Sequence, residues 1–291
     1  MNTLEFFRYR WRFRSLDVVR FPAGKSGNVL RGAFGIVLRE TATPAVYARI
    51  FNPAASQSAH PDGEKSPSGL ADWPRPFLFR TAAVDGLTIT PGAAFSIDMH
   101  LFEVRTPLES VFADAFRRLE TTGLGPGRGR VRLEGVDRLD LEDRATADAC
   151  TVALDPPGPA ADCVRVRFLT PTELKAGGEI AGRPEFASLF ARLRDRIANL
   201  SRLYGAQPIE TDFREMGERA AAVRLAACDI AWERVERKSS RTGQAHWMGG
   251  FTGEAEYRGA LTEFLPWLHA ARWTGVGRQT VWGKGDMRVL P

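Results

Sequence analysis

The stretch Gly275-Val-Gly-Arg-Gln-Thr-Val-Trp-Gly-Lys-Gly285 lies near the C-terminus and places bare glycines among cations. A shorter run, Gly123-Leu-Gly-Pro-Gly-Arg-Gly129, lies in the first half of the chain. Each run follows a predicted helix and precedes a predicted strand. Because glycine has no side chain, such a loop lets a phosphate or nucleotide approach the main chain closely. Two loops in corresponding places indicate one structural unit used twice.

Two familiar phosphate-binding motifs do not fit the C-terminal loop. A Walker loop needs four residues between its glycines and Ser or Thr after its lysine, but five separate Gly277 from Gly283 and Gly285 follows Lys284. A dinucleotide fingerprint that starts at Gly275 would need a third glycine where Thr280 stands. What is left is a bare backbone flanked by cations, which suits an RNA backbone.

The first half of the sequence alternates between strand and helix patterns. Phe7, Tyr9, Trp11 and Phe13 alternate with arginines, which predicts a strand with one aromatic face and one arginine face. The arginine face either follows phosphates or keeps a sheet soluble. The other elements predicted here are a helix over 29–40, a loop over 52–73, strands over 75–80 and 95–101, a helix over 108–119 and a strand from 131.

The second half repeats this order. The elements predicted here are a strand over 164–168, a helix over 186–200, strands over 224–236 and 244–257, a helix over 260–272 kinked at Pro266, and a strand over 287–290. Both halves match βαββαβ, so the fold class is α+β with two tandem ferredoxin-like, RRM-like domains. The expected boundaries are 1–137, a connection over 138–162, and 163–291. The alternative is an unrelated α+β protein whose loops contain glycine.

Composition favours a folded chain with a polyanionic partner. The 291 residues are 44% hydrophobic, enough to bury a core in each half, and 40 Lys plus Arg against 35 Asp plus Glu give a net charge of +5. The three cysteines form no C-x-x-C pair, so we expect no disulfide, metal or cofactor, and each cysteine is predicted to be a small core residue. Early charges such as Glu5 and Arg8 exclude a signal-peptide core, and we expect no membrane span and a cytoplasmic location.

Several stretches resemble one family. The Gly275–Gly285 loop, Phe168-Leu-Thr-Pro-Thr-Glu-Leu-Lys175 and Gly249-Gly-Phe-Thr-Gly253 resemble the C-terminal domain of CRISPR repeat-processing endoribonucleases of the RAMP superfamily. Leu30-Arg-Gly-Ala-Phe-Gly35, Tyr47-Ala-Arg-Ile-Phe51 and Pro74-Arg-Pro-Phe77 resemble the N-terminal half of the same family.

The resemblance implies a reaction and partners. Such enzymes cut CRISPR repeat RNA without metal, by attack of a ribose 2′-hydroxyl on the adjacent phosphate, and leave a 2′,3′-cyclic phosphate and a 5′-hydroxyl. The protein then stays bound to the stem-loop of the mature crRNA. Other subunits of a CRISPR effector complex are expected as further partners.

The sequence departs from the family where many relatives place a histidine, just after the first helix, because Tyr47-Ala-Arg-Ile-Phe51 contains none. The catalytic candidates are therefore His60 in the predicted loop, Tyr47 as acid or base, and Arg31 and Arg39 as cations for the phosphorane. An arginine-based site is similar to that of divergent type IV members.

A larger set of residues is expected to bind RNA through charge, bare backbone or stacking. The set comprises Arg49, Arg128, Arg130, Arg237, Lys238, Arg241, His246, Gly275, Gly277, Arg278, Gln279 and Lys284. His100 is expected to pack or face solvent on its strand. Two other functions stay open: a non-catalytic crRNA-binding subunit of an effector complex, and a ferredoxin-like enzyme acting on a small molecule.

Overall fold

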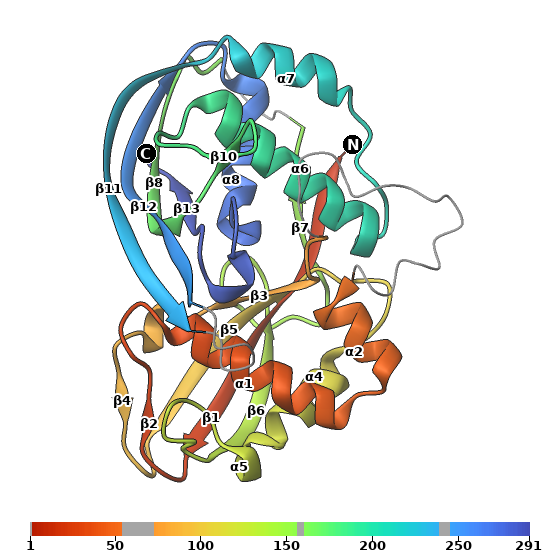
Figure 1. Cartoon of the computed structure of the whole chain (residues 1–291). Helices are drawn as coiled ribbons and strands as arrows, with labels where there is room; N and C mark the ends of the chain where they lie inside the picture. Colours follow the sequence, from red (N-terminus) through yellow and green to blue (C-terminus); the bar gives the residue numbers. More distant parts are fainter. Residues whose placement is uncertain (1, 54–72, 156–159, 239–244) are drawn as a thin grey trace.

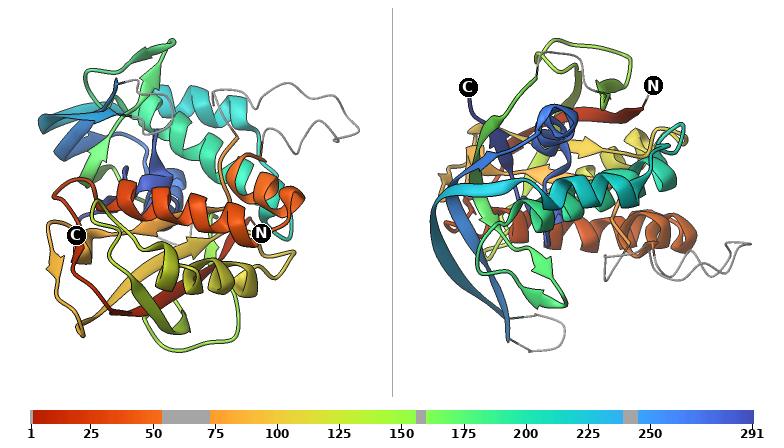
Figure 2. Two further views of the ribbon diagram at one scale, coloured as in Figure 1. Left: turned by 60° about the horizontal axis from the view of Figure 1, so that its bottom comes forward. Right: turned by 90° about the horizontal axis from the view of Figure 1, so that it is seen from above.

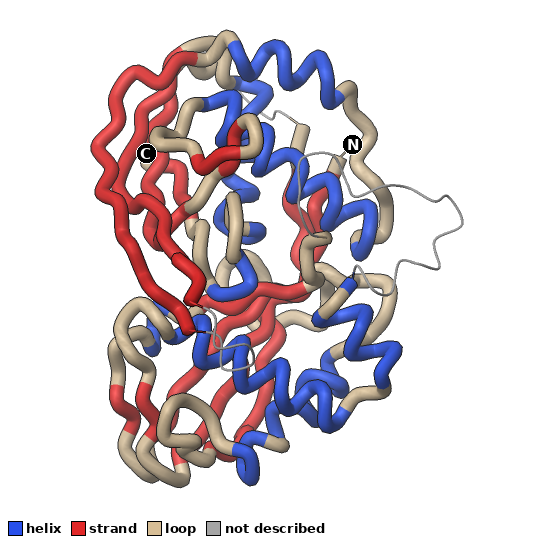
Figure 3. Tube along the Cα trace, viewed as in Figure 1, coloured by secondary structure: helices blue, strands red, loops and turns tan. Residues whose placement is uncertain are grey.

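The computed structural model describes residues 2–53, 73–155, 160–238 and 245–291. These residues form two large antiparallel sheets and two small two-stranded ones, β2-β4 and β10-β9 (Figures 1 and 3). The first large sheet has the order β3-β5-β1-β6 and the second β11-β12-β8-β13. The strands of the first are β1 (Thr3–Ser15), β3 (Phe77–Arg80), β5 (Ala94–Leu101) and β6 (Val131–Leu139), with β7 (Cys150–Ala153) paired to the start of β1. Those of the second are β8 (Cys163–Thr172), β11 (Arg224–Lys238), β12 (Ala245–Arg258) and β13 (Met287–Val289).

Helices connect these strands in the same way in both halves. The first half contains α1 (Ser26–Thr41), α2 (Pro44–Phe51), α4 (Glu109–Arg117) and α5 (Leu119–Thr122), and the second contains α6 (Phe186–Tyr204), α7 (Phe213–Ala221) and α8 (Leu265–Thr274). In Figure 2, α1 lies beside α4 and α6 beside α7. The short elements are β2 (Val19–Arg20), β4 (Thr88–Ile89), β9 (Lys175–Ala176), β10 (Glu179–Ile180), and the 3-10 turns η2 (Ala82–Val84), η3 (Thr262–Phe264) and η4 (Thr280–Trp282). Each half is thus βαββαβ, which confirms the predicted fold class.

The two faces of β1 behave differently. Trp11 is fully buried, with its ring 4.8 Å from that of Phe116 in α4, so the aromatic face forms the core of the first half. On the opposite face, Arg10 pairs with Asp98 at 2.7 Å and Arg12 with Asp137 at 2.9 Å. Much of the charge on the arginine face is therefore neutralised within the protein.

Two details of the sequence-based prediction are wrong. Pro266 lies in the first turn of α8 and does not kink a longer helix, because a proline there loses no intrahelical hydrogen bond. Of the three cysteines, Cys150 is buried, but Cys163 is exposed and Cys228 is half-buried, so the core prediction holds only for Cys150.

The second hydrophobic core includes residues from the first half of the chain. Leu4, Phe6, Phe102 and Cys150 belong to the cluster formed by β8, α6 and α8. In addition, the amide of Val104 donates to the carbonyl of Tyr204 at 3.0 Å. The halves therefore share one packed boundary. Among the described residues, no helix is long and apolar enough to cross a membrane.

Candidate functional site

The C-terminal glycine loop lies at the boundary between the two halves, directly after α8 (Figure 1). A Cβ added at Gly27 in α1 would lie 1.9 Å from the carbonyl oxygen of Trp282, so helix and loop meet backbone to backbone. On the other side, a Cβ at Gly283 would lie 3.2 Å from the carbonyl oxygen of Phe79 in β3. The loop therefore contacts two elements of the first domain while belonging to the second.

Hydrogen bonds hold the loop to the end of β8. The amide of Arg278 donates to the carbonyl of Glu173 at 3.0 Å, and that of Gly285 donates to the carbonyl of Pro171 at 3.2 Å. The Arg278 side chain also bonds the buried carboxylate of Glu173. Gly277 has φ of 79°, and a Cβ there would lie 2.4 Å from the Glu173 carbonyl oxygen. A glycine is needed at this position for both reasons.

The structure brings two of the predicted catalytic residues together. The guanidinium carbon of Arg31 lies 4.5 Å from the ring centroid of Phe51 and 4.8 Å from that of Trp282. The ring of Tyr47 stacks on Phe51 with 5.4 Å between centroids. We call Arg31, Tyr47, Phe51 and Trp282 the arginine–aromatic cluster. Trp282 connects this cluster to the glycine loop.

The other two catalytic candidates are not placed in this cluster. Arg39 is exposed and lies about 12 Å further along α1 than Arg31, at a rise of about 1.5 Å per residue. His60 lies outside the described residues.

The predicted RNA-binding residues are spread over several surfaces. Arg49 pairs with the buried carboxylate of Glu103, and Arg130 pairs with Asp17 at 2.7 Å, so both already hold internal partners. Arg128 is exposed with φ of 47°, at the tip of the N-terminal glycine loop.

The long hairpin of the second sheet contains four more of these residues. Arg237 lies opposite His246 in the backbone register of β11 and β12, and Lys238 lies opposite Ala245. Arg241 lies outside the described residues. Gln279, in the glycine loop, has a left-handed backbone with φ of 65°.

A cleft of about 790 Å³ opens between the two domains beside the glycine loop. It is bordered by Ser26 and Gly27 of α1 and by Trp282, Gly283 and Lys284 of the loop. Its walls contain both cations and carboxylates. The cations are Arg8, Arg10, Arg80, Arg272, Lys284 and Arg288, and the carboxylates are Asp85, Asp98, Asp143, Glu233 and Asp286.

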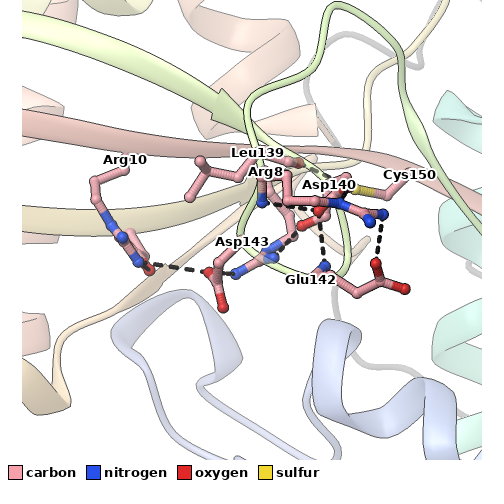
Figure 4. Close-up of polar contacts among 9 residues, drawn as sticks. Arg8, Arg10, Leu139, Asp140, Glu142, Asp143 and Cys150 are labelled. Atoms are coloured by element: carbon pink, nitrogen blue, oxygen red, sulfur yellow. Dashed lines mark hydrogen bonds and ion pairs between the residues drawn. The ribbon is translucent and has the colours of Figure 1, made fainter.

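Figure 4 shows the ion pairs at one side of this cleft. Arg8 donates to the carbonyl of Asp140 and to the carboxylate of Asp143, the latter at 2.8 Å. Arg10 lies 3.6 Å from the same Asp143 carboxylate. Arg144 pairs with Asp140 at 2.7 Å and so braces the turn that follows β6. Both arginines are therefore held in fixed positions by this turn.

Sequence reasoning missed the contribution of β3 and α8 to the cleft. Arg80 bonds the carbonyl of Arg272 and lies 3.4 Å from Asp286, and burial lowers the pKa of its guanidinium. His100 is buried beside it, with Nδ1 2.8 Å from the carbonyl oxygen of Trp273. Because a carbonyl only accepts, Nδ1 carries the proton. Burial, and next Arg80, lower the pKa of His100 well below its usual value. No local sequence pattern marks either residue, since both depend on domain packing.

The start of α1 is capped by a carboxylate from another element. The amides of Gly24 and Ser26 donate to Asp85 at 2.8 and 3.2 Å, and the Ser26 hydroxyl donates to it at 2.6 Å. Asp85 thus binds the free amides of the helix end. Within the described part of the chain, no three His, Cys, Asp or Glu side chains are grouped to hold a metal ion.

Comparisons with known proteins agree with this architecture. Residues 166–287 match the family model of the CRISPR-associated endoribonuclease Cas6, and residues 4–152 match a model described as an N-terminal domain. A solved Cas6 product complex shares 19% identity with a TM-score of 0.57, covering 99% of this chain and 100% of that one. Thermus thermophilus Cas6 shares 18% identity with a TM-score of 0.53, covering 100% of both chains. The comparison with curated proteins gives no match.

Paired ferredoxin-like domains with a glycine loop at their boundary define a RAMP-type protein. The family-model match of the second half narrows this class of protein to one family. Residues 166–287 match the Cas6 family of CRISPR-associated endoribonucleases, and the whole chain has the fold of solved Cas6 proteins, which supports a CRISPR repeat-processing endoribonuclease.

Proposed function

We propose that this protein cuts CRISPR repeat RNA without a metal ion and stays bound to the repeat stem-loop of its product. The observation that carries the proposal is the position of Arg31, held between Phe51 and Trp282 where α1 meets the glycine loop. A cation fixed at a phosphate-binding loop stabilises the charge that develops on a pentacovalent phosphorus. The 2′-hydroxyl of the RNA is itself the nucleophile, so in-line positioning supplies much of the rate.

The contacts of the arginine–aromatic cluster support a proposed role for each candidate. Arg31 contacts the scissile phosphate, and the Tyr47 hydroxyl, carried on the ring that stacks on Phe51, exchanges a proton with the reacting oxygens. Arg39 contacts the RNA backbone further along α1. His60 is a further proton-transfer candidate, to be tested by substitution. The domain boundaries stay at 1–137 and 163–291 in this proposal.

The proposed RNA path uses the glycine loop and the hairpin. Gly275 is buried and Gly277 is packed against the Glu173 carbonyl, so these glycines shape the loop, while Arg278, Gln279 and Lys284 supply its polar groups to the RNA. The hairpin formed by β11 and β12 enters a groove of the stem through Arg237, Lys238, Arg241 and His246, while Arg49, Arg128 and Arg130 contact flanking phosphates. Other effector subunits are proposed partners. A domain of similar fold, at 12% identity, occurs in a solved Cas6-RT-Cas1–Cas2 complex, which shows this fold within a larger assembly. The proposed location is the cytoplasm.

The deciding experiment incubates the purified chain with repeat hairpin RNA in EDTA. We expect one cut that leaves a 2′,3′-cyclic phosphate, and no cut when the nucleotide at the cut site is 2′-deoxy. Affinity for the uncut RNA should fall steeply with salt. Loss of cleavage in EDTA that returns with Mg²⁺ would contradict metal independence.

A non-catalytic crRNA-binding subunit is the second candidate function. The residues of the arginine–aromatic cluster favour this function. None of these four described residues is a histidine, the side chain that most often transfers protons in catalysis. Tight binding of the hairpin without any cut product would support this function instead.

Arg31→Ala should slow cleavage by roughly 100-fold, as loss of one fixed donor to a transition state does. Arg31→Lys should recover only part of the rate, because an ammonium stacks on the two rings less well. Arg214→Ala is the matched control, since the Arg214 side chain is 89% exposed on α7. Single-turnover rates of all three variants check the assignment. Equal rates for Arg31→Ala and the control would refute it.

A further inference from the structure

Lys284 differs from the other five cations of the cleft. Arg8, Arg10, Arg80 and Arg288 each lie within 4 Å of a carboxylate, and Arg272 lies 4.6 Å from the Trp273 ring centroid. For Lys284, the described residues provide no hydrogen bond and no ion pair, although its residue is only 6% exposed. An ammonium that lines a cleft, on a nearly buried residue and without a contact partner, is available to a ligand. Such a group points to a role with a ligand.

Two carboxylates face Lys284 at longer range, and each has another partner. Asp85 accepts from the Ser26 hydroxyl at 2.6 Å, and Glu233 accepts from Thr252 at 3.3 Å. Burial lowers the pKa of Lys284, while Glu233 and Asp85 act in the opposite direction. An ammonium in this position gives up a proton more readily than one in water does.

The backbone on either side of Lys284 is fixed. Gly283 and Gly285 have φ of 75° and 71°, and the Gly285 amide is bonded to Pro171. Two residues before Lys284, the ring of Trp282 holds Arg31. Residues 282–285 therefore place the Lys284 ammonium at the cleft and, through Trp282, hold the Arg31 guanidinium that is proposed to contact the phosphate.

We propose that Lys284 is the general acid of the cleavage reaction and protonates the departing 5′-oxygen. This inference rests on the proposed function. The 2′-oxygen forms a bond to phosphorus and passes its proton through the Tyr47 hydroxyl to water, while the bond between phosphorus and the 5′-oxygen breaks. The Lys284 ammonium transfers one proton to the 5′-oxygen and is left as a neutral amine. Water then returns a proton to the amine after the product strand has moved.

A substrate with sulfur in place of the bridging 5′-oxygen tests the role directly. A thiol has a pKa of about 8.5, far below that of an alcohol, so a thiolate leaves without a proton. Lys284→Ala should cut the oxygen substrate at least about 100-fold more slowly than wild type. It should cut the sulfur substrate within about threefold of the wild-type rate. Lys284→Arg should resemble Lys284→Ala, because a guanidinium keeps the charge and does not release a proton.

Other outcomes separate the inference from its basis. An equal defect of Lys284→Ala on both substrates, or no defect on the oxygen substrate, would overturn the role of Lys284 and leave the proposed function standing. If the wild-type protein cuts neither substrate, the proposed function is wrong, and so is the role of Lys284 that depends on it. Lys175→Ala, on β9, is the matched control and should cut both substrates at the wild-type rate.

Discussion

His100 is enclosed by aromatic rings at the domain boundary. Its ring centroid lies 5.5 Å from those of Phe6 and Trp273, and Nδ1 binds the Trp273 carbonyl. Both the burial and the nearby arginines Arg80, Arg8 and Arg288 oppose a positive charge on the imidazole. The folded protein therefore holds this histidine neutral at pH values where the unfolded chain would protonate it.

This neutrality predicts a pH dependence of stability. The pKa of His100 is lower in the folded state than its ordinary value of about 6.5, so the unfolded state binds more protons below that pH. The contribution of His100 to stability is complete above about pH 6.5 and is lost as the pH falls through the interval below. His100→Asn keeps a donor for the Trp273 carbonyl and removes the titration. We expect its slope of unfolding free energy between about pH 5 and 6.5 to be smaller than that of wild type by up to about 1.4 kcal/mol per pH unit.

Urea unfolding at a series of pH values measures that slope. Gln207→Ala serves as the control, since Gln207 is exposed and does not titrate. Identical slopes for wild type and His100→Asn would show that His100 titrates alike in both states.

At the level of elements, α1 is shaped by the loop that it touches. A Cβ at Gly27 would collide with the Trp282 carbonyl oxygen at 1.9 Å, whereas a Cβ at Gly32 on the same helix would meet nothing within 4 Å. Alanine normally stabilises a helix interior relative to glycine by roughly 1 kcal/mol. Alanine substitution at Gly32 therefore measures the effect of helix propensity alone, whereas substitution at Gly27 also measures the packing between helix and loop.

Gly27→Ala should lower the free energy of unfolding by about 1–3 kcal/mol, as overpacking does. It should also weaken hairpin RNA binding, because the glycine loop must shift away from α1. Gly32→Ala should raise the free energy of unfolding by about 0.5–1 kcal/mol and leave binding unchanged. Chemical denaturation and filter binding of both variants check this. A stabilised Gly27→Ala variant would contradict the described packing.

Helices with weak periodicity escaped prediction, although their capping signals are present in the sequence. Asp212 accepts from the amides of Arg214 and Glu215 at the start of α7, and Thr43 precedes Pro44 at the start of α2. Strict alternation in β1 and a long apolar stripe in α6 were sufficient to predict those elements correctly. Local pattern thus predicts elements well where one face is uniformly buried.

The site was less predictable than the fold. Arg31 and Tyr47 were named as candidates from sequence, but their common contact with Phe51 depends on the angle between α1 and α2. The approach of Trp282 to Arg31 joins residues from opposite ends of the chain. Similarly, Lys284 was expected only to bind RNA, because the burial of most of its surface depends on how the loop packs at the cleft. Spacing along the chain does not encode such contacts.

At the level of the whole molecule, the shared boundary predicts cooperative unfolding. Leu4, Phe6, Leu78 and Phe102 complete the core of the second half. A fragment over 163–291 would leave the surface that they cover exposed to water. We expect one urea transition for the full chain and no cooperative transition for this fragment, measured by tryptophan fluorescence and circular dichroism. A fragment that unfolds as sharply as the full chain would show that the second half is independent.

The attachment of the glycine loop has a consequence for the ligand. Its amides are bonded to Glu173 and Pro171 in one domain, and its middle abuts Gly27 and Phe79 in the other. Rotation of one domain against the other would break these contacts. The RNA-binding surface across the two domains is therefore rigid. We therefore expect the RNA strand, and not the protein, to bend on binding. Among repeat RNAs of equal stem stability, those with flexible nucleotides beside the stem should bind more tightly than those with rigid ones.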